Sequence, residues 1–188
     1  MNITTILGSP RKRGNTAAVL TQLKALLVPT HRVERIDLVD YTVKGCRGCE
    51  ACQRVVDRPG CVIKDDTERI LQTMIASDVV LYASPVYVWS VTAQMKALLD
   101  RSCCLVKWHK NQVTNALMEG MRAALLVTCG GTAEDNADLV QQIFEREMAY
   151  LRCKVVGKYV VAQCTTPGQL GSRAADTAQA IVRDIVGE

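Results

Sequence analysis

The chain of 188 residues has few aromatic side chains, which make up 4% of it and include a single Phe. Its core must therefore be mostly aliphatic. No stretch approaches the roughly 18 uninterrupted apolar residues that a membrane-spanning helix needs. The net charge of +4 comes without a basic tail or a dense Lys/Arg stripe, which argues against a nucleic-acid-binding module. The remaining composition is that of an ordinary globular protein.

A secretory signal is also missing. The first residues, MNITTILGSPRKRGN, place an apolar stretch before the basic residues, which is the wrong order for a signal peptide. Nine cysteines without such a signal favour a reducing, cytoplasmic setting, where thiols serve as metal ligands, redox groups or core residues. We expect small buried side chains at most of the isolated cysteines, namely Cys103, Cys104, Cys153 and Cys164.

Apolar β-type runs alternate with helical patterns along the whole chain. We expect strands at residues 2–8, 31–38, 79–85, 122–131 and 153–164. We expect helices at residues 15–27, 66–78, 92–103, 135–152 and 172–187, with a polar connection through about residue 118. Strands separated by helices predict a parallel, doubly wound α/β sheet with helices on both faces. No linker interrupts the pattern, so we expect one domain over 1–188, with a cysteine-rich insertion at about 44–64.

The loop after the first predicted strand, GSPRKRGNTA, has the features of a phosphate site. Gly8 permits a sharp exit from the strand, Ser9 and Thr16 offer hydroxyls, and Asn15 can cap the following helix. The helix N-terminus favours an anion, and Arg11 adds a bidentate partner. The loop is neither a dinucleotide fingerprint nor a Walker P-loop. On residue types alone, a polar β–α turn with a good N-cap also explains it.

The loop after the third predicted strand begins the segment SPVYVWSVTAQMKALLDR, residues 84–101. Pro85 stiffens the strand exit, and Tyr87 and Trp89 can flank a planar ring whose polar edge meets backbone amides. The alternative is that these two aromatic side chains cap the core.

Taken together and in this order, GSPRKRGNT, SPVYVWSVTAQMKALLDR and TCGGT resemble the NADPH-dependent FMN reductase family of flavodoxin-like proteins. The resemblance implies a five-stranded sheet of order 2-1-3-4-5, non-covalent FMN, NAD(P)H as co-substrate and a homodimer or homotetramer. Carried over by position, the cofactor-binding residues are Ser9, Arg11, Asn15 and Thr16 at the phosphate, Pro85, Val86, Tyr87 and Val88 at the ring edge, and Thr128, Gly130 and Gly131 on the opposite side. Because flavin supplies the redox chemistry, we expect no catalytic side-chain nucleophile or base.

Four cysteines gather in GCRGCEACQRVVDRPGC, residues 45–61. The C-x2-C-x2-C run with a fourth cysteine can hold a 4Fe-4S cluster. A zinc site more often uses two separated pairs, and a dithiol switch needs only two thiols, most easily Cys46 and Cys49. The segment resembles the cysteine motif of the iron-sulfur flavoprotein branch of the family, which implies Cys46, Cys49, Cys52 and Cys61 as metal ligands. The eight-residue gap before Cys61 is longer than that branch leads us to expect, and cofactor-free cysteine loops also occur.

The leading functional hypothesis is an enzyme, an FMN-dependent NAD(P)H oxidoreductase that passes electrons to a flavin, a quinone or another small acceptor. The alternative is an electron carrier that holds FMN and a 4Fe-4S cluster and exchanges electrons with a ferredoxin-like protein. A binding or regulatory protein without turnover is a third possibility, because a fold alone does not determine function.

Overall fold

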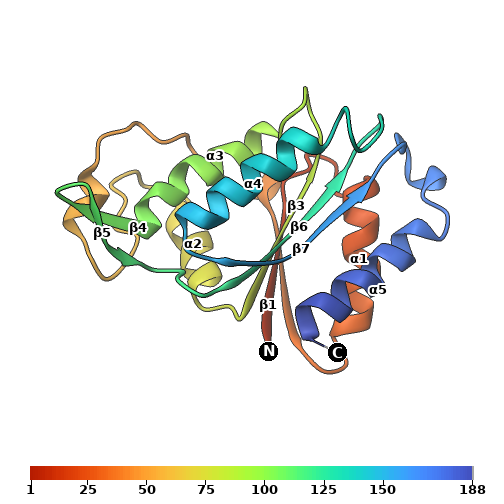
Figure 1. Cartoon of the computed structure of the whole chain (residues 1–188), viewed down its shortest axis with the longest axis horizontal. Coiled ribbons are helices and arrows are strands. Elements are labelled where there is room, and N and C mark those ends of the chain that lie inside the picture. The colour runs from red at the N-terminus through yellow and green to blue at the C-terminus, as the bar shows by residue number, and fades with distance from the viewer. Residues whose placement is uncertain (188) are drawn as a thin grey trace.

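The computed structural model describes residues 1–187 and shows a twisted sheet between two layers of helices (Figure 1). The strands are β1 (Asn2–Leu7), β2 (Arg32–Asp37), β3 (Val79–Pro85), β4 (Val106–His109), β5 (Gln112–Ala116), β6 (Arg122–Thr128) and β7 (Lys154–Val161). The α-helices are α1 (Asn15–Leu27), α2 (Thr67–Ile75), α3 (Ala93–Arg101), α4 (Asp138–Tyr150) and α5 (Arg173–Val186). Short 3-10 turns are η1 (Leu38–Asp40), η2 (Ala51–Arg54), η3 (Ser102–Leu105) and η4 (Pro167–Gln169).

The main sheet has the order β2-β1-β3-β6-β7, and all its neighbouring strands are parallel. This arrangement confirms the predicted flavodoxin-like order 2-1-3-4-5, because β6 and β7 are the fourth and fifth strands of the sheet. Helices α1 and α5 cover one face, and α2, α3 and α4 cover the other. Alternate residues of β1 separate accordingly, since Ile3 and Leu7 pack with α1 while Ile6 packs with α2 and α3.

Burial on both faces explains why the central strands are continuous apolar runs. All residues of β3 before Pro85 are buried, and so are all residues of β6 after Arg122. Because the strands are parallel, their carboxyl ends meet at one edge of the sheet, opposite the edge where Figure 1 places the chain termini. The loops that leave those ends therefore converge.

The expected polar connection before residue 118 contains an antiparallel hairpin that the sequence pattern did not predict. Strands β4 and β5 pair through a two-residue turn in which Lys110 and Asn111 have φ values of 49° and 62°. Positive φ at both turn positions matches the twist of a hairpin, but Asn-Gly is the usual signal for such a turn. The hairpin lies beside the cysteine-rich segment, away from the termini (Figure 1).

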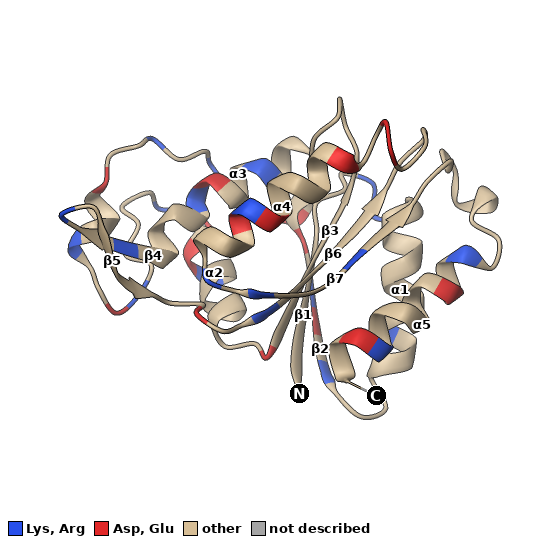
Figure 2. Cartoon of the chain, in the orientation of Figure 1, with Lys and Arg blue, Asp and Glu red and all other residues tan. Residues whose placement is uncertain are grey.

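Acidic and basic residues are interspersed along α3 and α4 (Figure 2). Within residues 1–187, no helix combines the length and the apolar character needed to cross a membrane.

Candidate functional site

A cleft of about 870 Å³ opens at the carboxyl ends of β1, β3, β6 and β7. In a doubly wound sheet this edge holds ligands, next to the point where the strand order reverses. The residues that line the cleft are Ser9, Pro10, Arg11, Lys12, Arg13, Gly14, Asn15, Thr16, Pro85, Val86, Tyr87, Thr128, Cys129, Gly130, Cys164, Thr165, Thr166 and Pro167. Nine of the eleven predicted cofactor-binding residues are in this set, and Val88 and Gly131 are not.

The N-terminus of α1 opens into this cleft without a side-chain cap. Gly14 occupies the N-cap position and Asn15 is the first helical residue, so the expected capping role of Asn15 is wrong. The Asn15 amide instead donates to the Cys164 carbonyl at 2.9 Å, and its buried Oδ1 has no partner among the described residues. The first-turn N–H groups of the helix are therefore free for an anionic ligand.

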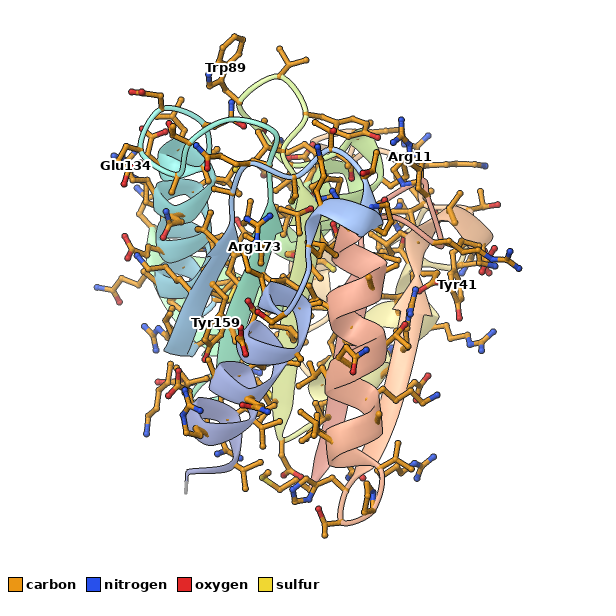
Figure 3. All side chains as sticks on the ribbon, turned by 90° about the vertical axis from the view of Figure 1, so that its right-hand side faces the viewer. Arg11, Tyr41, Trp89, Glu134, Tyr159 and Arg173 are labelled. Carbon is orange, nitrogen blue, oxygen red and sulfur yellow. The ribbon has the colours of Figure 1, made fainter. Side chains whose placement is uncertain are left out.

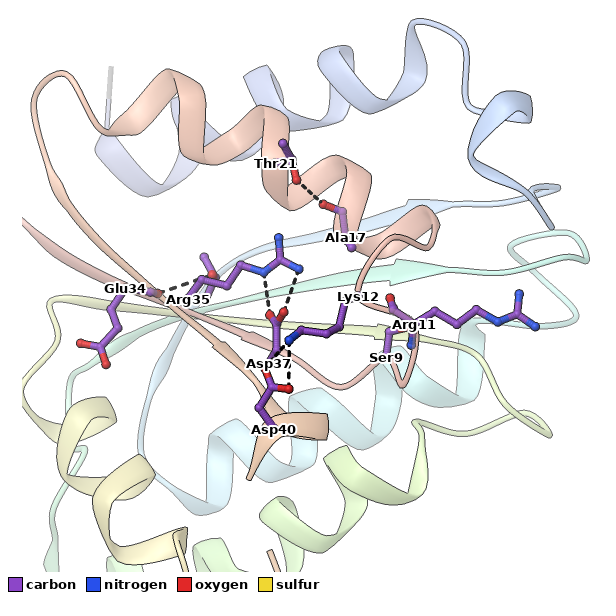
Figure 4. A network of polar contacts seen from close by, with 10 residues as sticks. Ser9, Arg11, Lys12, Ala17, Thr21, Glu34, Arg35, Asp37 and Asp40 are labelled. Carbon is purple, nitrogen blue, oxygen red and sulfur yellow. Dashed lines mark hydrogen bonds and ion pairs between the residues drawn. The ribbon is translucent and has the colours of Figure 1, made fainter. Parts of the chain in front are cut away.

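The loop ahead of α1 is held by its own contacts, and of its three cations, Arg11, Lys12 and Arg13, only Lys12 has a partner among the described residues. The Ser9 hydroxyl accepts a hydrogen bond from the Arg11 N–H at 3.1 Å and donates to the Arg11 carbonyl at 3.2 Å. Lys12 forms an ion pair with Asp40 at 2.7 Å. Figure 4 shows the Arg11 side chain extending away from that pair, and no described residue forms a hydrogen bond or ion pair with its guanidinium.

The predicted ring loop is a tight turn that protrudes from the end of β3. Tyr87 and Ser90 exchange backbone hydrogen bonds of 2.8 and 3.0 Å, and the two residues between them have positive φ. Tyr87 is 41% exposed and Trp89 is 56% exposed, so neither aromatic side chain caps the core, and Val88 between them is 86% exposed. Figure 3 shows Trp89 at the same end of the molecule as Arg11, where its indole N–H donates to the Asp135 carbonyl at 3.1 Å.

Two neighbouring segments complete the cleft. Thr16 and Thr128 share a buried hydroxyl–hydroxyl hydrogen bond of 2.7 Å, which joins α1 to β6 below the phosphate loop. The loop after β7, residues 164–167, lines the cleft although the sequence analysis missed it. Its signal was available, because a Thr-Thr-Pro-Gly turn follows the last strand of a parallel sheet at the ligand-binding edge.

A second cavity, of about 820 Å³, lies between the cysteine-rich segment and the end of α3. Six cysteines line it, namely Cys46, Cys49, Cys52, Cys61, Cys103 and Cys104. The four predicted metal ligands thus face one cavity together with two cysteines that were expected to be ordinary core residues. Within residues 1–187, no three Cys, His, Asp or Glu side chains converge as a metal-binding group.

The cysteine cavity is backed by two buried cations, which differ in their partners. Arg101 forms an ion pair with Asp65 at 2.8 Å, and both side chains are buried. Burial opposes the ionisation of Asp65, but the Arg101 guanidinium and the N–H groups of Lys44 and Thr67 outweigh it and lower its pKa to about 2. Lys107, which is 1% exposed, donates only to backbone carbonyls and has no carboxylate in ion-pair distance among the described residues.

Burial also acts on the thiols of this cavity. It raises the pKa of Cys104 to about 12, and it raises the pKa values of Cys52 and Cys103. Without a metal these thiols are therefore held in their protonated form at neutral pH. A bound metal would reverse this, because a coordinating thiol is deprotonated.

Comparisons with known proteins agree with this architecture. The profile of the NADPH-dependent FMN reductase family matches residues 1–168. An iron-sulfur flavoprotein of Methanosarcina thermophila is 39% identical over 64% of this chain and 63% of its own length. One of Archaeoglobus fulgidus is 39% identical over 51% of this chain and 43% of its own length. The solved NAD(P)H:quinone oxidoreductase of Methanothermobacter marburgensis has a TM-score of 0.72 at 16% identity, covering 96% of each chain.

The matches confirm the predicted family and fold class. The assignment to oxidoreductases that use FMN and NAD(P)H agrees with the description of that family. The match covers only 63% and 43% of the lengths of these two curated relatives, so their cluster is not carried over as a finding.

Proposed function

This chain belongs to the NADPH-dependent FMN reductase family, and from that membership we propose an FMN-dependent NAD(P)H oxidoreductase that reduces a small acceptor such as a flavin or a quinone. The observation that supports the proposal most directly is the cleft at the carboxyl ends of the strands. The uncapped N-terminus of α1 and the Arg11 side chain form its cationic side, and Pro85, Val86 and Tyr87 form another.

The residues present fit FMN. The free N–H groups of α1 and the Arg11 guanidinium suit a phosphate, and the cleft volume of about 870 Å³ suits a ligand of this class. Asn15 also lines the cleft, and its buried Oδ1 has no hydrogen-bond partner among the described residues. Residues at the ring loop would orient the flavin through their backbone. When bound, FMN supplies the hydride and electron chemistry, so the protein needs no acid–base pair.

The test is purification followed by reduction without oxygen. We expect FMN to copurify, and we expect NADH or NADPH to bleach the flavin absorbance in the absence of any other protein. FMN that binds but is reduced by neither nicotinamide would contradict the proposal. Protein that never retains FMN would instead favour a binding role without turnover.

The second cavity supports the iron-sulfur electron carrier as a second candidate function, with a ferredoxin-like partner. Its six thiols are the donors that iron-sulfur clusters use. A metal–thiolate cluster is anionic, and the buried Lys107 ammonium lacks a carboxylate partner among the described residues, so it can serve as the countercharge. We propose Cys46, Cys49, Cys52 and Cys61 as the ligands, and the cluster would transfer single electrons.

Strictly anaerobic purification tests this second candidate. We expect a brown protein with about four irons per chain, and we expect Cys46→Ala to lose the iron. Cys153→Ala is the matched control, because Cys153 lies outside the cysteine cavity and should leave the iron content unchanged. Iron-free wild-type protein from such a preparation would remove the candidate.

We also propose a homodimer or homotetramer in the cytoplasm. The ring loop supports self-association, since Val88 and Trp89 expose apolar surface beside the cleft. Light scattering after size-exclusion chromatography tests it. A monomer at micromolar concentration would contradict it.

A further inference from the structure

Two sulfur atoms of the cysteine cavity are already in contact. Cys46 Sγ and Cys103 Sγ lie 3.8 Å apart, although the residues are 57 positions apart in the chain. Within residues 1–187, no other pair of cysteine sulfurs forms a hydrogen-bond contact of this kind. A disulfide bond is about 2.05 Å long, so the two thiols need an approach of about 2 Å to become bonded.

The two cysteines differ in how firmly their backbones are held. Cys103 lies in η3, where Ser102 and Leu105 are completely buried, and its own side chain faces the cavity. Cys46 is exposed and lies in residues 42–50, which form neither helix nor strand. The two glycines that flank it, at positions 45 and 48, have open space around them. The segment around Cys46 can therefore supply the approach while Cys103 stays fixed.

Cys49 is the competing partner for Cys46, because a C-x-x-C pair is the usual redox dithiol. Cys49 is exposed, and among the described residues its sulfur forms no hydrogen bond with another cysteine. Gly48 and Glu50, on either side of it, both have positive φ, at 63° and 54°. The observed backbone thus brings Cys103, rather than Cys49, against Cys46.

We propose that Cys46 and Cys103 form a redox-active dithiol, which a low-molecular-weight disulfide oxidises to an intramolecular disulfide. The Cys46 thiolate attacks one sulfur of the oxidant, which forms a mixed disulfide and releases the first thiolate. The Cys103 thiol then displaces the second thiol from the Cys46 sulfur, giving up its proton. In total, the protein loses two protons and two electrons, and the oxidant takes up both and becomes two thiols.

This bond would control the cysteine cavity. Cys46 has one sulfur, so it cannot join Cys103 and ligate a metal at the same time. The disulfide would also tie the exposed end of the cysteine segment to the end of α3. This consequence rests on the proposed cluster, whereas the disulfide itself does not. The dithiol would therefore determine when the cluster site is open for assembly.

Peptide mapping of oxidised, cluster-free protein tests the proposal. The protein is freed of metal with a chelator, equilibrated anaerobically with mixtures of glutathione and glutathione disulfide, alkylated, and digested with trypsin without reduction. Trypsin separates the candidates, because Cys46 falls in residues 45–47, Cys49 and Cys52 in 48–54, and Cys103 and Cys104 in 102–107. We expect a peptide of residues 45–47 linked to residues 102–107.

Three variants complete the test. In Cys104→Ser, which removes the other thiol of the same peptide, we expect the link to persist. In Cys103→Ser, we expect Cys46 to carry glutathione, and any link to Cys49 to need roughly tenfold more oxidant than the wild-type disulfide. Cys46→Ser can form neither the link to Cys103 nor the mixed disulfide of Cys46 with glutathione. This variant therefore shows whether Cys103 reacts with glutathione disulfide on its own. Retained circular dichroism shows that each variant is folded.

The outcomes decide between the alternatives. A link from residues 45–47 to 48–54 in the wild-type protein, or no link at all in excess glutathione disulfide, would overturn the proposal. In iron-loaded protein we expect the link to be suppressed at least about tenfold, since metal-bound thiolates are withheld from exchange. If no iron binds, the proposed cluster is contradicted. The peptide map of the wild-type protein still decides whether Cys46 and Cys103 form a disulfide.

Discussion

The two cavities of this protein are built in different ways. The cleft at the strand ends is formed by four loops that leave neighbouring parallel strands, so the sheet itself sets their separation. The cysteine cavity is formed by a segment with little regular structure, the end of α3 and the β4–β5 hairpin. Side-chain contacts to backbone join these parts, including Asn115 with the Val56 carbonyl at 2.8 Å and Gln53 with the Val106 carbonyl at 3.1 Å.

This difference in construction determines which substitutions would disrupt each cavity. Ladder hydrogen bonds between neighbouring strands and the two apolar clusters on the faces of the sheet support the first cavity. The second depends on a few buried polar groups, above all the Asp65–Arg101 pair and Lys107. We therefore expect point substitutions to damage the cysteine cavity more than the cleft.

The largest effect is expected at the Asp65–Arg101 pair, which fixes the start of the cysteine segment. Asp65 accepts from the Lys44 N–H at 2.9 Å, and Arg101 donates to the Lys44 carbonyl at 2.9 Å. Asp65→Asn would leave the Arg101 charge buried and uncompensated. We expect it to lower the free energy of unfolding by about 3–5 kcal/mol, measured by urea denaturation at neutral pH.

The pH dependence gives this prediction its sign. The pKa of Asp65 is lowered in the folded protein to about 2, so its stabilisation is complete above the unfolded pKa of about 3.9. That stabilisation is lost as the pH falls from about 4 towards 2, and the Asp65→Asn variant should lack this part of the loss. Asp100→Asn, which breaks the exposed pair with Lys96, is the control and should cost at most about 0.5 kcal/mol. An equal loss in both variants would contradict the importance given to the buried Asp65–Arg101 pair over an exposed pair in the same region.

The next effect compares two neighbouring cations at the cleft. Arg11 has no hydrogen-bonding or ion-pair partner within the described residues, whereas Lys12 is paired with Asp40. A charged hydrogen bond contributes about 1.5–3 kcal/mol, so we expect Arg11→Ala to weaken FMN binding by about 10- to 100-fold. Lys12→Ala should change it less than about threefold, because that exposed ion pair contributes little. Fluorescence titration with FMN measures both, and equal losses would show that net positive charge alone holds the phosphate.

The sequence predicted the cleft more completely than it predicted the cysteine cavity. The phosphate loop and the ring loop are continuous segments after buried strands, so their meeting could be predicted from parallel strand order. Most of the cleft was therefore predictable. Val88 lies outside the cleft lining, at the tip of the turn, and its positive φ of 48° is not what a β-branched residue in the sequence predicts.

The cysteine cavity was predicted less completely, for a physical reason. The contact between Cys46 and Cys103 joins segments 57 residues apart, and it depends on a hairpin whose Lys-Asn turn has no strong sequence signal. The polar stretch around Lys107 is typical of a surface segment, yet the fold buries its ammonium against the Cys52 and Pro59 carbonyls. Local spacing identified the first cysteines but could not identify the groups that reach them from α3 and the hairpin.

The smallest effect concerns backbone strain in the ring loop, which the strands around the cleft do not share. A left-handed backbone costs a residue with a Cβ atom about 1–2 kcal/mol, and Val88 adopts one at a φ of 48°. Because Val88 is 86% exposed, Val88→Gly loses little packing, and we expect it to raise the free energy of unfolding by about 1 kcal/mol. Val62→Gly is the matched control, since Val62 is exposed without a positive φ and should lose about 0.5–1 kcal/mol. If urea denaturation shows Val88→Gly to be as destabilising as Val62→Gly, the turn is unstrained. In that case the rigidity of the cleft would extend to the tip of its ring loop.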